Sequence, residues 1–222
     1  MLTESFAEAN ICVMELTLAS VALQAGRGHR FVQQSVRRGD LAALRLVGRQ
    51  VVVDDLAATA WARSLASGRK WSFGVREAAF DLLSFGRTAR LSASERSRLR
   101  SRLRGMDARC IAHAAGGLGG TWGRYRAASS PELELIGPSR IRDSVGGVVP
   151  GGSWVRFGRT ADLDRFEQEF DVVLDADGAL GVVERADADD REARILLDCY
   201  LLGDARLSQA SAAQLEERAH GL

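Results

Sequence analysis

Residues 26–53 read GRGHRFVQQSVRRGDLAALRLVGRQVVV, a polar helical pattern followed at once by a hairpin pattern. From residue 29 the spacing is helical, with Phe31, Val32 and Val36 on one side and Gly39 at the end. The opposite side carries long polar side chains at the i, i+3, i+4 and i+7 places: Arg30, Gln33, Gln34 and Arg37. The stretch therefore predicts an amphipathic helix with an Arg- and Gln-rich outer face.

The segments on either side predict the neighbours of this helix. Upstream, Thr17 can cap a helix over LASVALQAG. Downstream, LAALRLV and QVVV are typical of two strands joined by a tight turn at Gly48–Arg49. Asp54 then caps DLAATAWARSLAS, a helix that we expect to end at Gly68. The order helix, turn, helix, hairpin, helix predicts a winged helix-turn-helix within residues 1–70.

The residue types on this helix suit the reading of base edges in DNA. Arg can bond guanine bidentately and Gln can bond adenine in the same way, and a recognition helix presents such residues from its first turns. Arg at the hairpin tip lies where a wing meets phosphate or the minor groove. The predicted DNA-binding residues are Arg27, His29, Arg30, Gln33, Gln34, Arg37, Arg38 and Arg49. The plain alternative is a solvated helix face.

Residues 71–128 predict a helical extension. SFGVREAAFDLLSFG has an amphipathic pattern, and Ser92 with Glu95 forms a capping box before the next helix. That helix, SERSRLRSRLRGM, carries five arginines that cannot share a single stripe, so they predict a basic sheath that is either solvated or in contact with phosphate. AAGGLGGTWGRYRAASSP reads as a loop-rich junction, which places a boundary near residue 128.

Residues 129–222 predict an acidic α+β domain. LELIG, SWVRFG, DVVLD and ALGVVER are short strand patterns, the last two joined by a hairpin turn at residues 175–178. DDREARILLDCYLLGD and SQASAAQLEERA predict closing helices, the first with an exposed acidic start at Asp187, Asp189 and Asp190. The fold class predicted for the whole chain is therefore α+β.

Charge divides along the chain although the formal net charge is only +1. Residues 1–128 carry 20 Lys/Arg against 10 Asp/Glu, whereas residues 129–222 carry 10 against 19. A basic half joined to an acidic half indicates two partners of opposite charge. The alternatives are a chance fluctuation of surface charge and an acidic surface that has no partner.

Catalytic and metal-binding patterns are weak. His29, His113 and His220 lie near no recognisable Ser or Cys nucleophile, and GGLGGTWG lacks the Lys-Ser/Thr ending of a phosphate loop. The three cysteines are scattered, which favours a reducing compartment and gives no zinc spacing. The first residues are acidic where a signal peptide is basic. We therefore expect a cytoplasmic protein with no membrane contact, cofactor, metal or catalytic residue; an enzyme is the remote alternative.

Two consecutive stretches resemble known families. Residues 18–60, LASVALQAGRGHRFVQQSVRRGDLAALRLVGRQVVVDDLAATA, resemble the excisionase-like and MerR-like helix-turn-helix pattern, although GRGH replaces the usual small polar residues before the recognition helix. Residues 68–107, GRKWSFGVREAAFDLLSFGRTARLSASERSRLRSRLRGMD, resemble the middle region of actinobacterial AbiEi-type antitoxins, with GRxW and an LSxxERSRLRxRL helix. The residues after 128 match such proteins only loosely.

This resemblance implies an antitoxin that represses its own operon and neutralises a partner toxin. The implied toxin is a nucleotidyltransferase or a PIN-domain nuclease. Because a single winged module buries only about 600–1,000 Å² on DNA, we expect a homodimer on double-stranded operator DNA. The acidic range 129–222 would then bind the toxin. An ordinary winged-helix transcription regulator with a C-terminal ligand- or partner-sensing domain is the alternative, because it would share the same first half.

Overall fold

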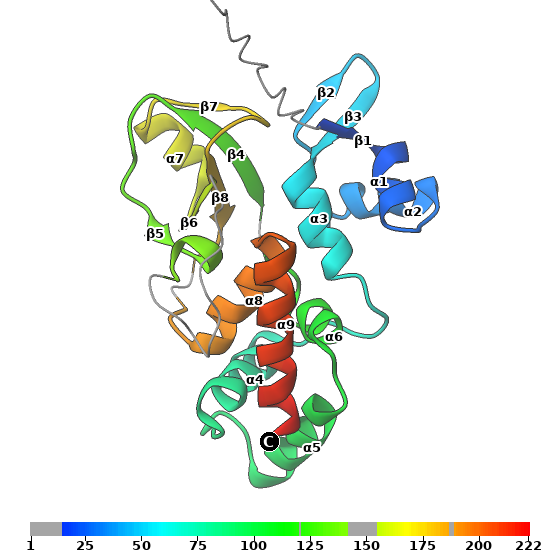
Figure 1. Cartoon of the computed structure of the whole chain (residues 1–222), viewed down its shortest axis with the longest axis vertical. Coiled ribbons are helices and arrows are strands. Elements are labelled where there is room, and N and C mark those ends of the chain that lie inside the picture. Colours follow the sequence, from blue (N-terminus) through cyan, green and yellow to red (C-terminus); the bar gives the residue numbers. More distant parts are fainter. Residues whose placement is uncertain (1–14, 120, 142–154, 187–188) are drawn as a thin grey trace, which may run out of the picture.

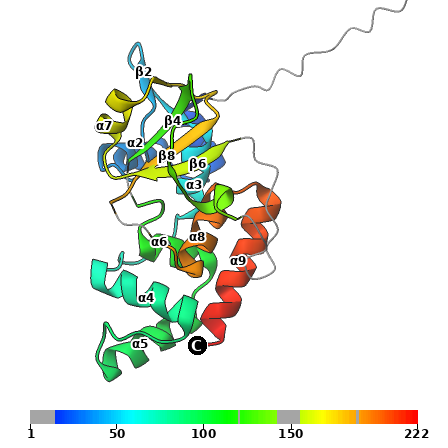
Figure 2. The same ribbon diagram turned by 90° about the vertical axis from the view of Figure 1, so that its left-hand side faces the viewer.

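The computed structural model describes residues 15–119, 121–141, 155–186 and 189–222, and the fold is α+β, as predicted. It contains a three-stranded antiparallel sheet in the order β1-β3-β2 and a five-stranded mixed sheet in the order β5-β6-β8-β4-β7. Figure 1 shows the two sheets side by side above a group of helices; in the quarter turn of Figure 2 the sheets overlap and again lie above these helices.

The N-terminal part is built from short elements around the first sheet. In chain order they are β1 (Glu15–Thr17), α1 (Leu18–Gln24), α2 (His29–Arg37), β2 (Arg45–Val47), β3 (Gln50–Asp54) and α3 (Asp55–Arg63). The caps predicted at Thr17 and Asp54 are confirmed, because their side chains accept the backbone N–H groups of Ser20 and Ala57. The sequence did not predict β1, which pairs antiparallel with β3.

Helix α3 ends earlier than expected. The sequence predicted a helix up to Gly68, but the last helical residue is Arg63. The Ser64 hydroxyl donates a hydrogen bond to the Trp61 carbonyl at 2.8 Å and so helps to satisfy the end of the helix. The predicted end was therefore wrong by about one turn.

Three helices form the middle of the chain: α4 (Phe73–Phe85), α5 (Ala93–Arg104) and α6 (Ala108–Ala115). The capping box of Ser92 and Glu95 is confirmed, with both reciprocal hydrogen bonds present. Leu99 and Leu103 on α5 are buried, as the helical spacing requires.

The second sheet contains one strand that the sequence did not predict. Its elements are β4 (Trp122–Ala127), β5 (Glu134–Leu135), β6 (Arg156–Thr160), α7 (Leu163–Glu169), β7 (Val172–Leu174) and β8 (Leu180–Glu184), with a 3-10 turn at Gly137–Ser139. β4 lies within the stretch predicted to be a loop-rich junction. It lies between β7 and β8 in the sheet. The prediction that these two strands form a hairpin around the turn at residues 175–178 was therefore wrong, because each of them pairs with β4 instead.

The turn between β7 and β8 passes very close to β4. A Cβ atom at Gly178 would lie 2.1 Å from the Tyr125 carbonyl oxygen, so a side chain there would collide with the backbone of β4. Tyr125 is buried with Leu163 and Phe166 in a small second core, where α7 covers one face of the sheet.

The last two helices, α8 (Glu192–Leu202) and α9 (Ala205–His220), return to the middle of the molecule. They pack against one another and against α3, α4, α5 and α6, and the main buried core extends from Leu16 to Ala219. Contacts therefore cross the boundary predicted near residue 128. The division into ranges 1–70, 71–128 and 129–222 stays a prediction.

The acidic start predicted for α8 needs correction. Asp187 lies outside the described residues. Asp189 is not exposed as expected, because its carboxylate pairs with Arg191 at 2.6 Å and its side chain is only 10 % exposed. Asp190 is exposed and pairs with Arg140 at 2.7 Å. Burial of Asp189 beside Arg191 removes its charge from the surface.

Candidate nucleic-acid interface

Helix α2 presents the polar face that the sequence predicted. Val32 and Ser35 are buried on the inner side, and the Ser35 hydroxyl donates to the Phe31 carbonyl at 3.1 Å. On the outer side Arg30, Gln34 and Arg37 are exposed, whereas Gln33 is half-buried. Within the described parts of the chain these four side chains make no hydrogen bond or ion pair. They are available to a ligand.

Phe31 does not join the core as its spacing indicated. It is 38 % exposed, and its ring lies 6.1 Å from the ring of Trp61 on α3. The Arg27 guanidinium stands over the same ring, 5.6 Å from its centre. Arg27 is thereby held beside the N-terminus of α2, next to the exposed His29.

Arg38 differs from the other predicted DNA-binding residues. Its Nε lies 3.3 Å from a carboxylate oxygen of Asp40, whose other oxygen accepts from the Lys70 ammonium at 2.8 Å. Arg38 thus has a partner within the chain, and its positive charge is partly balanced. Asp40 lies only two residues after Arg38, but its second partner, Lys70, lies thirty residues away, and the sequence prediction missed both contacts.

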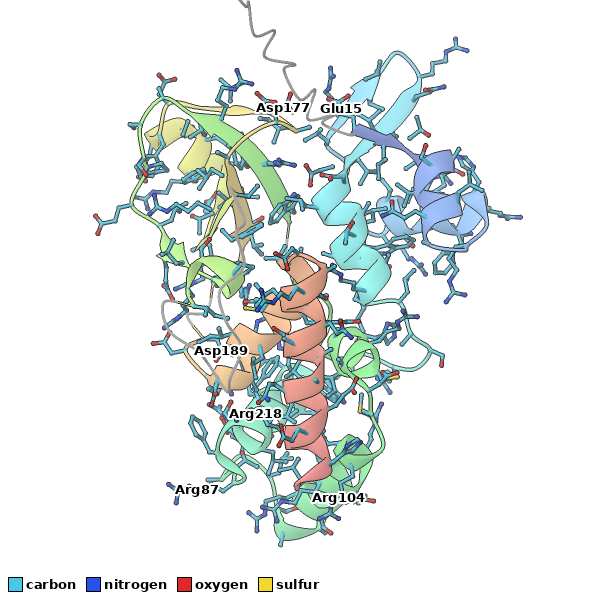
Figure 3. All side chains as sticks on the ribbon, in the orientation of Figure 1. Glu15, Arg87, Arg104, Asp177, Asp189 and Arg218 are labelled. Carbon is cyan, nitrogen blue, oxygen red and sulfur yellow. The ribbon has the colours of Figure 1, made fainter. Side chains whose placement is uncertain are left out.

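The hairpin projects beyond α2 at one end of the molecule (Figure 3). Val47 faces Gln50 in the strand register, so Gly48 and Arg49 alone form the turn, with Gly48 at φ 60°. Arg49 is exposed at the tip. The residue before the turn, Val47, and Leu46 are 47 % and 69 % exposed, an apolar surface that the sequence prediction missed.

A buried ion-pair cluster connects this part to the second sheet. Arg124 on β4 is 3 % exposed. Its Nη1 lies 3.3 Å from an Asp54 oxygen and 3.2 Å from an Asp55 oxygen. Its Nε donates a hydrogen bond to the Gly178 carbonyl at 2.8 Å. Burial raises the pKa of Asp54, and the hydrogen bond from Ala57 and the charge of Arg124 only partly oppose that increase. The cluster holds the start of α3 against β4.

A second anchor lies at the other end of α3. The Arg63 guanidinium donates from one nitrogen to three backbone carbonyls at the C-terminus of α8: Tyr200, Leu201 and Gly203. The Tyr200 hydroxyl donates back to the Arg63 carbonyl at 3.0 Å. Both ends of α3 are therefore fixed to the rest of the molecule, which gives α2 and the hairpin a rigid support.

A cleft of about 690 Å³ separates α2 and α3 from α6 and the start of β4. Phe31, Trp61 and Trp122 supply aromatic walls, and Lys70 and His113 lie at its polar side. The His113 ring nitrogens lie 3.2 Å from the Ser64 carbonyl and 3.0 Å from that of Gly68, so this side chain positions the loop after α3. No sequence pattern pointed to the cleft, because its walls come from separate segments.

An acidic edge lies on the second sheet. We use this name for the exposed carboxylates on and around α7 and β7, which are Asp162, Asp164, Glu167, Glu169, Asp171 and Asp177. β7 is the last strand of that sheet and bonds only to β4 among the described strands. Two apolar residues of β7, Val173 and Leu174, are 65 % and 43 % exposed. This edge combines unpaired strand backbone, apolar side chains and negative charge.

The remaining observations assign no chemistry to the chain. No three His, Cys, Asp or Glu side chains lie close enough to hold a metal ion in the portion of the chain that the structure describes. Within the same residues, no helix is both long and apolar enough to span a bilayer. No family model, no curated protein and no solved structure matches the chain.

Proposed function

We propose that residues 15–63 form a winged helix-turn-helix that binds double-stranded operator DNA. The observation that carries the proposal is the exposed polar face of α2, which has no partner among the described residues and is followed along the chain by a hairpin with a two-residue turn. In this arrangement α2 enters the major groove and β2–β3 is the wing. The fixed ends of α3 support the proposal, because base reading needs a helix that is held rigidly.

The side chains divide into two roles. Arg30, Gln34 and Arg37 read base edges along the length of α2, with Gln33 partly screened. Arg27, His29 and the wing residue Arg49 contact phosphate and set the register, whereas Arg38 contributes less because Asp40 balances its charge. A single module of this size buries only about 600–1,000 Å² on DNA, so we propose a homodimer on an inverted repeat.

Titration of the DNA upstream of the gene tests this proposal. Gln34→Ala should weaken binding by about 1–3 kcal/mol on that DNA and leave random DNA unaffected. Arg49→Ala should weaken binding to both and reduce the salt slope by about 0.9. Arg206→Ala, on the exposed side of α9, is the matched control. If the α2 and wing variants bind like this control, the interface is assigned to the wrong surface.

We further propose that the protein is a cytoplasmic antitoxin that represses its own operon, with no enzymatic activity. Its partner would be a basic toxin, either a nucleotidyltransferase or a PIN-domain nuclease, as the resemblance implies. The acidic edge supports such a partner better than Asp189, which is buried and paired with Arg191. In the edge Glu169 pairs with Arg165 and Glu167 accepts from the Tyr125 hydroxyl, so the remaining negative charge comes from Asp162, Asp164, Asp171 and Asp177. Complementary charge would speed association, and Val173 and Leu174 would supply apolar contact.

Co-expression with the product of the adjacent gene tests the antitoxin role. Asp164→Lys with Asp171→Lys should slow association and weaken growth rescue, and leave DNA binding equal or stronger. Glu132→Lys with Glu217→Lys makes the same change of charge at exposed positions elsewhere. Equal rescue by both double variants would remove the acidic edge from the toxin interface, and failure of the wild type to rescue would remove the antitoxin role itself.

The cleft favours a second candidate, a transcription regulator that senses a small ligand. Its volume lies within the range of ligand sites, and Phe31 places one wall on the proposed recognition helix. The sequence-based alternative placed the sensor in residues 129–222, whereas this cleft lies mainly among earlier residues. A ligand that raises thermal stability and changes operator affinity, with Trp61→Ala abolishing both effects, would establish this candidate.

A further inference from the structure

Helix α5 carries the most strongly charged surface that the proposed DNA interface does not use. It contains five arginines within twelve residues and one acid, Glu95. Two hydrogen bonds from Ser92 lower the pKa of the Glu95 carboxyl, which is therefore occupied in the capping box. The helix lies at the opposite end of the molecule from the hairpin (Figure 1), and Figure 3 places Arg104 there.

The arginines of α5 form two rows, with serines between them. Leu99 and Leu103 face the core, and directly opposite them lie the exposed side chains of Ser94, Ser97 and Ser101. Because residues four apart share a face, Arg96, Arg100 and Arg104 make one row, and Arg98 and Arg102 make the other. Each row borders a shallow hollow, of about 290 Å³ and 280 Å³ respectively.

One row is held in place by the neighbouring loop. The Arg96 guanidinium donates to the Thr88 carbonyl at 3.1 Å, and that of Arg100 donates to the Gly86 carbonyl. Fixed guanidinium groups lose less conformational freedom when they bind an anion than free ones do. The other row and Arg104 are exposed to solvent.

We infer that α5 is a second DNA-binding surface, one that contacts the backbones of duplex DNA without reading sequence. A helix with its side chains is about 10–12 Å wide, which matches the width of about 12 Å of the major groove. Two arginine rows on its flanks would face the two phosphate backbones that border the groove, and Arg binds phosphate bidentately. The serines between the two rows would face the base edges at the floor of the groove, where their hydroxyl groups can donate to or accept from any base.

The composition of this face distinguishes DNA from a protein partner. Protein interfaces are centred on apolar and aromatic side chains and are depleted of charge at the core. The exposed residues of α5 itself include no aromatic residue and no aliphatic residue larger than Ala93, and the aliphatic side chains of Val75, Leu91 and Leu99 lie only at the base of the hollow beside Arg98 and Arg102. The chemistry of this face therefore complements a phosphate backbone.

This inference goes beyond the proposed function and does not depend on it. Because α2 and α5 lie far apart on the molecule, one protein could hold two duplex segments at once. Binding at α5 would persist even if α2 bound nothing.

The test compares two triple variants in a background that lacks α2 binding, Arg30→Gln with Arg37→Gln. The first changes Arg98, Arg102 and Arg104 to Gln; the control makes the same change at Arg126, Arg165 and Arg206, which are exposed on other surfaces. Gln keeps a high helix propensity, and circular dichroism with a thermal transition checks that each variant folds. The probe is a labelled 24-base-pair duplex of random sequence, titrated at several salt concentrations.

The α5 variant should weaken binding at least tenfold and reduce the slope of log K against log salt by about 2–3, as expected for three lost phosphate contacts. The control variant should change the affinity and the salt slope by less than half as much as the α5 variant does. Equal behaviour of the two triple variants would overturn the inference. So would tighter binding to single-stranded DNA or duplex RNA than to duplex DNA, or self-association of the background protein that the α5 variant alone abolishes.

Discussion

Replacement of Arg124 by Ala is the most sensitive probe of how the proposed DNA-binding part is held. Arg124 and Asp54 are 3 % and 1 % exposed, so the lost guanidinium leaves a carboxylate buried inside the protein. In Arg124→Ala the Asp54 carboxylate stays buried, with the Ala57 N–H as its remaining hydrogen bond among the described contacts. The Gly178 carbonyl loses the donor at 2.8 Å as well.

Removal of one partner from a buried ion pair destabilises a protein by about 3–5 kcal/mol, because the other charge is left unpaired. The free energy of unfolding of a typical domain is about 5–15 kcal/mol, so this loss would be a large part of it. For a chain of this length, about 2–4 °C of melting temperature corresponds to 1 kcal/mol. We therefore expect the melting temperature to fall by roughly 6–20 °C.

Urea unfolding followed by circular dichroism measures the change, and Arg126→Ala is the matched control. Arg126 lies two residues along the same strand and pairs with Asp175 at 2.8 Å, but its side chain is 69 % exposed. An exposed pair contributes about 0–1 kcal/mol, so the control should differ little from the wild type.

The pH dependence separates this explanation from simple loss of packing. The pKa of Asp54 is already raised, and loss of Arg124 raises it further. A group whose pKa is raised on folding adds stability below its unfolded pKa and loses it as the pH rises through the folded value. The loss in Arg124→Ala should therefore be smaller near pH 4 than at pH 7. A loss below about 1 kcal/mol, or one independent of pH, would refute the reasoning.

Three further predictions follow from the fold. Gly48→Ala should lower the free energy of unfolding, measured in urea, by about 1–2 kcal/mol, because Gly48 has φ 60°, which is unfavourable for alanine. A Cβ atom there would meet nothing within 4 Å, so no steric clash adds to this cost. The backbone N–H of Cys110 lowers the pKa of Asp107, so Asp107→Ala should cost about 1 kcal/mol at pH 7, and the difference from wild type should narrow as the pH falls below about 4. A fragment of residues 1–128 should show no cooperative urea transition, because it lacks α8, α9 and both strands that flank β4.

Local features of this fold could be predicted because they depend on residues a few positions apart. The caps at Thr17, Asp54 and Ser92 each join a side chain to a backbone N–H three residues later. The two-residue turn at Gly48–Arg49 and the polar face of α2 are equally local. The exposure of Arg30, Gln34 and Arg37 was therefore predicted correctly, whereas Gln33 is half-buried and Phe31 is more exposed than expected; the DNA that this face would read stays a prediction.

Non-local features could not be predicted in the same way. The strand pattern of β4 is interrupted by Arg124, which can be buried only because it bonds to Asp54 and Gly178. Asp54 lies seventy residues before Arg124 and Gly178 lies fifty-four residues after it. The pairing of β7 and β8 with β4 likewise joins distant segments, as does the ion pair of Lys70 with Asp40. The cleft and the acidic edge arise from segments that only the tertiary fold brings together.

The most direct test of the central claim is selection of binding sites from a random DNA library with the wild type and with Gln34→Ala. If α2 reads base edges, the wild type should select a two-fold symmetric motif. Gln34→Ala should select the same motif with its preference lost at one or two adjacent positions in each half, because one side chain contacts one or two bases. Selection of no motif by the wild type, or of an unchanged motif by Gln34→Ala, would contradict the account.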